Sequence, residues 1–167
     1  MLRKMMRSAA ALIVLGVMIT AATACAASSS AGSRSTLYDS LDAISADSSA
    51  LVIGTVRQQV GEGSTTVSSV EVTNAPSNPQ LGSNLDDDPG AVQVGDVVEV
   101  RQDAEPFLES GVEYLLFLTP SELPGDAASQ YFITGAVAGL YERDGGEFRR
   151  VVTDSGDKMP ETITIAE

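Results

Sequence analysis

Carboxylates, hydroxyls and a single cysteine are the side chains through which this protein could carry out chemistry, because its 167 residues include no histidine. Without an imidazole the sequence has no Ser–His or Cys–His nucleophilic pair. Almost every type of protein zinc site is excluded for the same reason. Any catalysis would therefore have to proceed without an imidazole base.

Two short motifs near the C-terminus match parts of known catalytic sites but lack the partners that those sites need. Asp154-Ser155-Gly156 has the form of an aspartic-protease turn, but that chemistry needs a second carboxylate, and the chain has no second copy. Ser155-x-x-Lys158 matches the first element of the penicillin-binding serine enzymes, whose other two elements are absent. We interpret both motifs as an ordinary turn, and we predict no catalytic residue and no cofactor.

Acidic side chains also occur in a long loop, residues 74–90, that is rich in Pro, Gly, Asn and Asp. Asn84 and the acidic residues after it place oxygen atoms at alternate positions, as at the start of a calcium-binding loop. Pro89, however, takes the place of the glycine that an EF-hand loop requires. A solvated acidic loop is the commoner interpretation of such a run. The alternative is a calcium site formed by Asp86, Asp87 and Asp88.

The N-terminus carries the pattern of a secretory signal peptide. Basic residues precede an apolar core over residues 9–19, and small residues then lead to Cys25. The apolar core is too short to span a bilayer, which takes about 20 residues. We therefore predict that residues 1–24 are a signal peptide and contribute nothing to the fold.

Thr23-Ala24-Cys25, followed by a serine-rich stretch, resembles the lipobox of bacterial lipoproteins, in which the cysteine receives a diacylglyceryl group and becomes the N-terminus. Ala22 replaces the leucine that is usual there, so ordinary secretory cleavage is the alternative. Cys25 is the only cysteine of the chain and lies at the cleavage position, which favours lipidation. The resemblance implies attachment to the outer face of the cell membrane through Cys25, with residues 25–35 as a flexible lipidated tether.

The predicted mature protein is strongly acidic. Three basic residues leave with the leader, which changes the formal net charge from −13 to −16. Nucleic acid repels so acidic a surface, and we predict no nucleic-acid partner. With Cys25 modified no disulfide can form, so apolar packing must hold residues 36–167 together as a single domain.

Residues 111–120, with the sequence GVEYLLFLTP, form the most continuously apolar stretch outside the leader. Its aromatic and aliphatic residues run without interruption from Tyr114 to Leu118, between turn-forming residues at Gly111 and Pro120. A run that is this short predicts a central strand buried on both faces. The other candidate strands alternate apolar and polar residues, so we expect them to surround it.

One short helix and several further strands are predicted around the central strand. Leu37, Leu41 and Ile44 recur at helical spacing after Thr36-x-x-Asp39, which indicates a capped helix over residues 36–46. The predicted strands are residues 50–60 with a bend at Gly54, 65–73 with a bulge near Ser68-Ser69, 92–101, 131–134, a hairpin over 140–152, and 162–165. The pattern predicts a mainly β fold, a small antiparallel OB-like barrel of five to seven strands with one short N-terminal helix.

Four segments of this pattern carry a family resemblance: LVIGTV, SSVEV, GDVVEVRQ and LESGVEYLLFL. Their arrangement, over residues 41–118, resembles extracytoplasmic domains of Gram-positive bacteria. It also resembles, more distantly, the netrin and metalloproteinase-inhibitor module, an OB-like five-stranded barrel. That module inhibits through an N-terminal cysteine and several disulfides, neither of which this chain provides. The resemblance therefore implies the barrel and not the inhibitory activity.

Together these features predict a lipid-anchored protein of the cell envelope that acts as a non-catalytic binding or structural module. Its partners would be the membrane, through the lipid on Cys25, and an envelope protein that the sequence does not identify. The alternative is a carboxylate-based hydrolase of cell-wall glycans, which would need two carboxyl groups facing each other across a cleft. The absence of tryptophan and the low aromatic content speak against sugar stacking.

Overall fold

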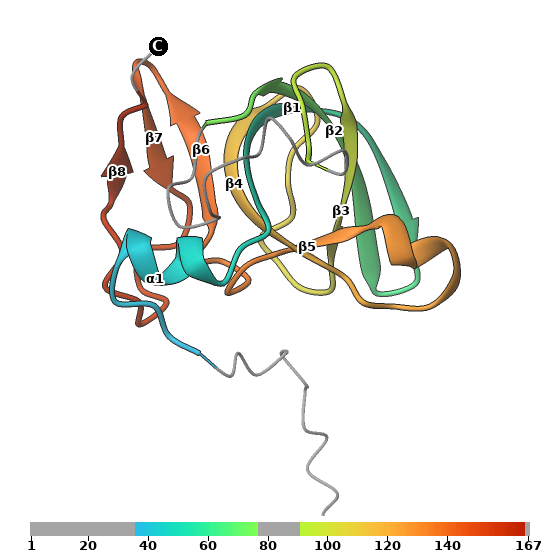
Figure 1. Cartoon of the computed structure of the whole chain (residues 1–167), viewed down its shortest axis with the longest axis horizontal. Coiled ribbons are helices and arrows are strands. Elements are labelled where there is room, and N and C mark those ends of the chain that lie inside the picture. The colour runs from blue at the N-terminus through green and yellow to red at the C-terminus, as the bar shows by residue number, and fades with distance from the viewer. Residues whose placement is uncertain (1–35, 77–90, 166–167) are drawn as a thin grey trace, which may run out of the picture.

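A computed structural model of the chain describes residues 36–76 and 91–165, which form a β-barrel with a smaller sheet beside it (Figure 1). Within these residues the barrel strands follow the order β1-β2-β3-β5-β4, and β4 pairs with β1 to close it. All pairs are antiparallel except β3 with β5. The barrel strands are β1 (Ala50–Glu62), β2 (Thr65–Asn74), β3 (Val97–Gln102), β4 (Glu113–Pro120) and β5 (Tyr131–Ile133).

The same sheet continues from β4 through three further strands, which we call the smaller sheet, and a short helix lies beside them (Figure 1). Its strands are β6 (Leu140–Asp144), β7 (Glu147–Arg150) and β8 (Thr162–Ile163), the helix is α1 (Leu41–Ala46), and a 3-10 helix, η2 (Gly125–Ser129), precedes β5. No helix in the described part of the chain is long and apolar enough to cross a membrane. The predicted fold class, a mainly β OB-like barrel with one short α-helix before its first strand, is confirmed.

Strand β4 is the element around which both cores form, and the prediction that it is buried on both faces is confirmed. Leu116 and Leu118 point into the barrel, where they pack with Val52, Val70 and Val100. Leu115 and Phe117 point outward into a second core between the barrel, α1 and the smaller sheet. That second core is completed by Tyr38, Ile44, Ile53, Ala138, Tyr141, Phe148 and Met159. The chain thus buries apolar residues in two layers, with β4 between them.

The predicted bend at Gly54 is confirmed, because the pairing of β1 with β2 shifts register between Ile53 and Gly54. A Cβ atom on Gly54 would lie 2.6 Å from Val70 Cγ1 and 2.7 Å from the carbonyl oxygen of Glu71. Only a glycine lets the two strands approach so closely at this point.

The predicted bulge near Ser68-Ser69 is wrong. The irregularity lies across from it in β1, between Val56 and Gln58, and β2 pairs with β3 without a shift. Ser68 is fully buried at an inward position, where its hydroxyl accepts a hydrogen bond from the Gln59 side chain (3.2 Å). A small polar residue, hydrogen-bonded in the interior, therefore accounts for the break in the apolar pattern of β2.

The helix is shorter than the predicted span of residues 36–46. It starts at Leu41, and Ser40 caps it by accepting a hydrogen bond from Ala43 N (3.2 Å). The main chain of Tyr38 pairs elsewhere: its N–H donates to Asp157 Oδ1 (2.8 Å), and its carbonyl accepts from Lys158 N (2.8 Å). These long-range contacts keep the segment before Ser40 extended.

Other boundaries differ by a few residues. Strand β3 begins at Val97 and not at residue 92, because Gly95 takes a positive φ of 92° in a turn. The predicted hairpin at residues 140–152 is confirmed with its turn after Asp144, but β7 ends at Arg150. The side chain of Arg150 is buried and donates to the carbonyls of Thr153 (2.7 Å) and Asp157 (3.3 Å), which turns the following loop back toward Tyr38.

Candidate functional site

The shortness of β5 leaves one end of the barrel without a complete strand wall. β5 pairs with the last part of β4, and β6 takes over the same edge of β4 at Tyr114–Leu116. Residues 134–139 form a turn between them. The N–H of Thr134 donates to the carbonyl of Phe117 (2.8 Å), whose own N–H donates to the carbonyl of Gly139 (3.1 Å). The parallel strands β3 and β5 therefore end side by side, and the loops that follow them separate.

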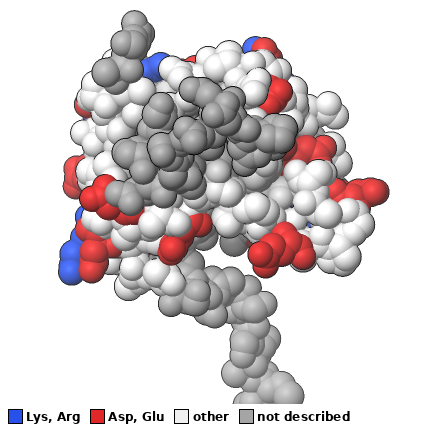
Figure 2. Space-filling model, in the orientation of Figure 1, with Lys and Arg blue, Asp and Glu red and all other residues white. Residues whose placement is uncertain are grey.

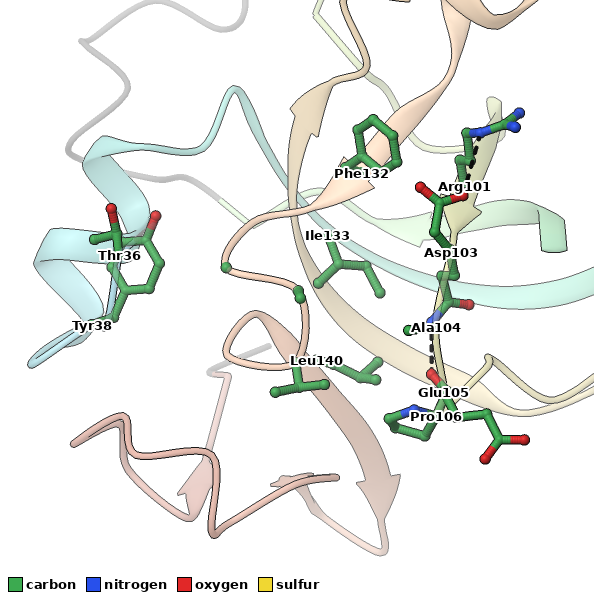
Figure 3. Close-up of a pocket in the computed structure, with 14 residues that line it drawn as sticks. Thr36, Tyr38, Arg101, Asp103, Ala104, Glu105, Pro106, Phe132, Ile133 and Leu140 are labelled. Atoms are coloured by element: carbon green, nitrogen blue, oxygen red, sulfur yellow. Dashed lines mark hydrogen bonds and ion pairs between the residues drawn. The ribbon is translucent and has the colours of Figure 1, made fainter. Parts of the chain in front are cut away.

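A pocket of about 540 Å³ lies between these two loops, and we call it the barrel-end pocket (Figure 3). Small-molecule sites in proteins commonly have volumes of 300–1,000 Å³ and often lie in the mouths of β-barrels. The lining residues are Thr36, Tyr38, Arg101, Gln102, Asp103, Ala104, Glu105, Pro106, Phe132, Ile133, Gly135, Ala136, Val137 and Leu140. One wall is the segment after β3, the other is the end of β5 and the turn after it, and the N-terminal segment completes the rim.

The interior of the pocket is apolar. Ile133 and Leu140 also belong to the barrel core and are 6% and 1% exposed, so they close the pocket toward the interior. Phe132 is half-buried, and the buried Tyr38 is held by a hydrogen bond from its hydroxyl to Asp47 Oδ2 (3.0 Å). Fixed aromatic and aliphatic side chains of this kind are suited to bind an apolar group.

The polar side of the pocket is occupied by an ion-pair network. Nη1 of Arg101 donates to Glu62 Oε2 (3.0 Å) and to Gln130 Oε1 (3.2 Å), and its Nε lies 3.8 Å from Asp103 Oδ1. The guanidinium group points away from Phe132 and Ile133 (Figure 3). Thr65 Oγ1 donates to the same Asp103 oxygen (2.5 Å). Arg101 therefore presents no unpaired positive charge to a ligand.

The wall after β3 is fixed by the buried side chain of Gln102. Its Nε2 donates to the carbonyl of Pro106 (2.8 Å), and its Oε1 accepts from Leu108 N (2.9 Å). Leu108 is 2% exposed, so this segment packs under the end of the barrel. Because both ends of the amide are used, the wall is ordered before any ligand binds.

The opposite wall contains two consecutive residues in the left-handed region, Gly135 (φ 62°) and Ala136 (φ 56°). A Cβ atom on Gly135 would lie 2.5 Å from the ring of Tyr38, so glycine is required there. Ala136 is not a glycine, and its left-handed conformation destabilises the fold by about 1 kcal/mol. Strain of this kind concentrates at binding sites, which supports a role for this wall.

We expect the substitution Ala136→Gly to raise the free energy of unfolding by about 0.5–1 kcal/mol, because glycine adopts a positive φ without strain. The melting temperature should rise by a few degrees, as measured by calorimetry. Ala128→Gly, at an exposed position of η2 without positive φ, is the matched control and should lower stability slightly. A loss of stability in Ala136→Gly as large as in the control would contradict this account of the wall.

The sequence-predicted site residues lie apart from this pocket. Cys25 and the candidate calcium ligands Asp86, Asp87 and Asp88 are outside the described residues. Within residues 36–76 and 91–165 no group of three His, Cys, Asp or Glu side chains could hold a metal ion. Ser155 Oγ donates to Asp157 Oδ2 (2.6 Å), and Lys158 Nζ lies 3.3 Å from Asp39 Oδ1. The segment that contains both motifs, residues 154–158, thus has a structural role: it binds the N-terminal segment through Asp157 and Lys158.

Sequence reasoning missed the barrel-end pocket. The one local signal is the run of small residues between β5 and β6, with the sequence TGAVAG, whose two glycines disfavour a strand and which is too apolar for an ordinary exposed loop. Comparisons with protein-family models and with curated proteins gave no match to the chain. The resemblance to the netrin and metalloproteinase-inhibitor module therefore stays a prediction.

Proposed function

We propose that this protein is a lipid-anchored module of the cell envelope that binds a ligand in the barrel-end pocket and catalyses no reaction. The observation that carries the proposal is the pocket itself, with its volume of about 540 Å³, its apolar floor and its pre-ordered walls. A folded chain gains nothing in stability from such a space, because an unfilled apolar cavity forfeits packing contacts.

Anchoring is supported by the leader and by Cys25, and the position of the pocket fits it. The chain enters the described fold at Thr36, which lines the pocket, and the tether of residues 25–35 directly precedes it. A ligand at this site would therefore be held on the side of the domain from which the tether leaves.

A broad protein-binding patch has less support than the pocket. The exposed large apolar residues of the described chain lie singly on several elements, namely Leu37, Val60, Val94, Val97, Leu123 and Val151. Single exposed apolar residues are ordinary features of a protein surface. Acidic side chains occur in several separate groups on the uncovered part of the face shown in Figure 2.

The second candidate function, glycan hydrolysis, finds less support at this pocket. Its two acidic residues, Asp103 and Glu105, belong to the same wall, and the facing wall over residues 132–140 contains no acidic residue. Asp103 is engaged by Thr65 and Arg101, and the Glu105 carboxylate points away from Leu140 (Figure 3). Glycoside hydrolysis needs two carboxyl groups on either side of the bond that is cut.

The test is native mass spectrometry of the protein isolated from its own membrane. We expect a bound mass that is released on denaturation, and we expect Ala104→Trp to abolish it, because Ala104 is an exposed pocket residue that can be enlarged without disturbing the core. Ala128→Trp, at an exposed position away from the pocket, is the matched control and should retain the mass. A parent protein without any bound mass, or equal occupancy in both variants, would refute the proposal.

A further inference from the structure

We infer that the ligand of the barrel-end pocket is the alkyl chain of a membrane lipid whose headgroup carries no net negative charge, taken from the leaflet in which the protein is anchored. The inference rests on the proposed function and specifies its ligand. It follows from three properties of the pocket: where it opens, what lines it, and which charges border it.

The pocket lies next to the segment through which the domain would be attached to the membrane. Thr36 belongs to its rim, and only residues 26–35 separate Thr36 from Cys25. A Gly/Ser-rich linker of this length has a mean reach of about 15–20 Å, less than the width of a small domain. The surface next to the attachment point, which contains the pocket, is therefore the part of the domain held closest to the lipid.

The lining of the pocket suits an alkyl chain better than a polar molecule. The wall and floor of the pocket are apolar and consist of Phe132, Ile133, Val137 and Leu140. The aromatic ring of Tyr38 also lines the pocket, on the other side of Phe132 and Ile133 from Asp103 (Figure 3). Each methylene that such a surface removes from water raises affinity about fourfold. Affinity should therefore depend steeply on chain length until the pocket is full.

The charges at the rim determine which lipid headgroup can lie there when the alkyl chain fills the pocket. Arg101 is the one cation among the lining residues, and its guanidinium group contacts Glu62, Asp103 and Gln130 and points away from the cavity. The Asp103 carboxylate borders the same side. One arginine faces two carboxylates, those of Glu62 and Asp103, so this side of the pocket carries net negative charge. That charge would repel an anionic headgroup and attract the positive group of a zwitterionic or cationic headgroup.

The experiment measures binding of two detergents with the same chain, dodecylphosphocholine and dodecyl phosphate, by calorimetry below their micelle concentrations. The mature chain is used with Cys25→Ala, so that it is soluble without lipid. We expect dodecylphosphocholine to bind at least tenfold more tightly than dodecyl phosphate. Octylphosphocholine should bind more weakly by about fourfold for each methylene removed.

Matched variants locate the binding. Ala104→Trp should weaken dodecylphosphocholine binding at least tenfold, and Ala128→Trp should leave it unchanged. Asp103→Asn removes a negative charge beside Arg101 and should reduce the ratio between the affinities for dodecylphosphocholine and dodecyl phosphate. Asp126→Asn, on the exposed first turn of η2, should not change it.

Three outcomes would overturn the inference. Equal or tighter binding of dodecyl phosphate would refute the headgroup assignment. Failure of both detergents to bind, while a non-lipid mass still co-purifies with the parent protein, would refute the lipid and leave the proposed function standing. Binding by the Cys25→Ala chain but not by the lipidated parent would identify the protein's own acyl chain as the occupant in place of a separate lipid.

Discussion

Replacing Leu116 by alanine should lower the free energy of unfolding by about 2–5 kcal/mol. Leu116 is fully buried at the centre of β4, where it packs in the barrel core and pairs with β1 on one edge and β6 on the other. Neighbouring strands cannot move inward to fill the space, because the same strand supports the second core on its other face. The melting temperature should fall by on the order of 10 °C in calorimetry or in urea titration.

Leu123 provides a control of the same residue type, since it is 37% exposed in the loop after β4. Leu123→Ala should change stability by no more than about 0.5 kcal/mol. If both substitutions had similar small effects, β4 would not be the element that joins the two cores.

The second large effect concerns location. We expect Cys25→Ala to move the protein from the membrane fraction to the medium, because two acyl chains anchor a protein firmly and the variant cannot receive them. The parent protein should begin at Cys25 and carry a diacylglyceryl-sized mass increment that the variant lacks. Intact-mass measurement of both fractions tests this directly.

Ser28→Ala, within the same serine-rich segment, is the control and should leave both the mass increment and the membrane retention in place. An unmodified parent chain in the medium would mean that the protein is secreted freely. The barrel-end pocket would then belong to a freely secreted protein, and its ligand would not come from an anchoring membrane.

The fold was predictable where a pattern is local. Five consecutive apolar residues identified β4, the Asp144-Gly145-Gly146 turn identified the hairpin of β6 and β7, and Gly54 marked the point where β1 bends. In each case the physical requirement acts on the residue itself: burial on two faces, a tight reversal, or space for a neighbouring strand.

The errors arose where distant contacts overrode a local pattern. Residues 36–40 have a good helical spacing, but Tyr38 is used by Asp157 and Lys158, more than a hundred residues away in the chain. The buried hydrogen bond from the N–H of Tyr38 to Asp157 stabilises the extended segment more than the weak helical propensity of a few residues would stabilise a helix. Likewise, the phase break in β2 predicts a bulge, because the sequence gives no sign that the Gln59 side chain would donate a hydrogen bond to Ser68 in the interior.

The sequence by itself excluded imidazole chemistry and predicted most strands of the barrel, because the absence of histidine and the spacing of apolar residues can be read without knowing which residues are neighbours in space. Only the tertiary structure decided where a ligand could bind. The barrel-end pocket exists because β5 and β6 divide one edge of β4 and the turn between them moves away from the end of β3. Its two walls are about thirty residues apart in the chain, so their separation and the charge pairing of Arg101 depend on how the barrel closes, which no local pattern records.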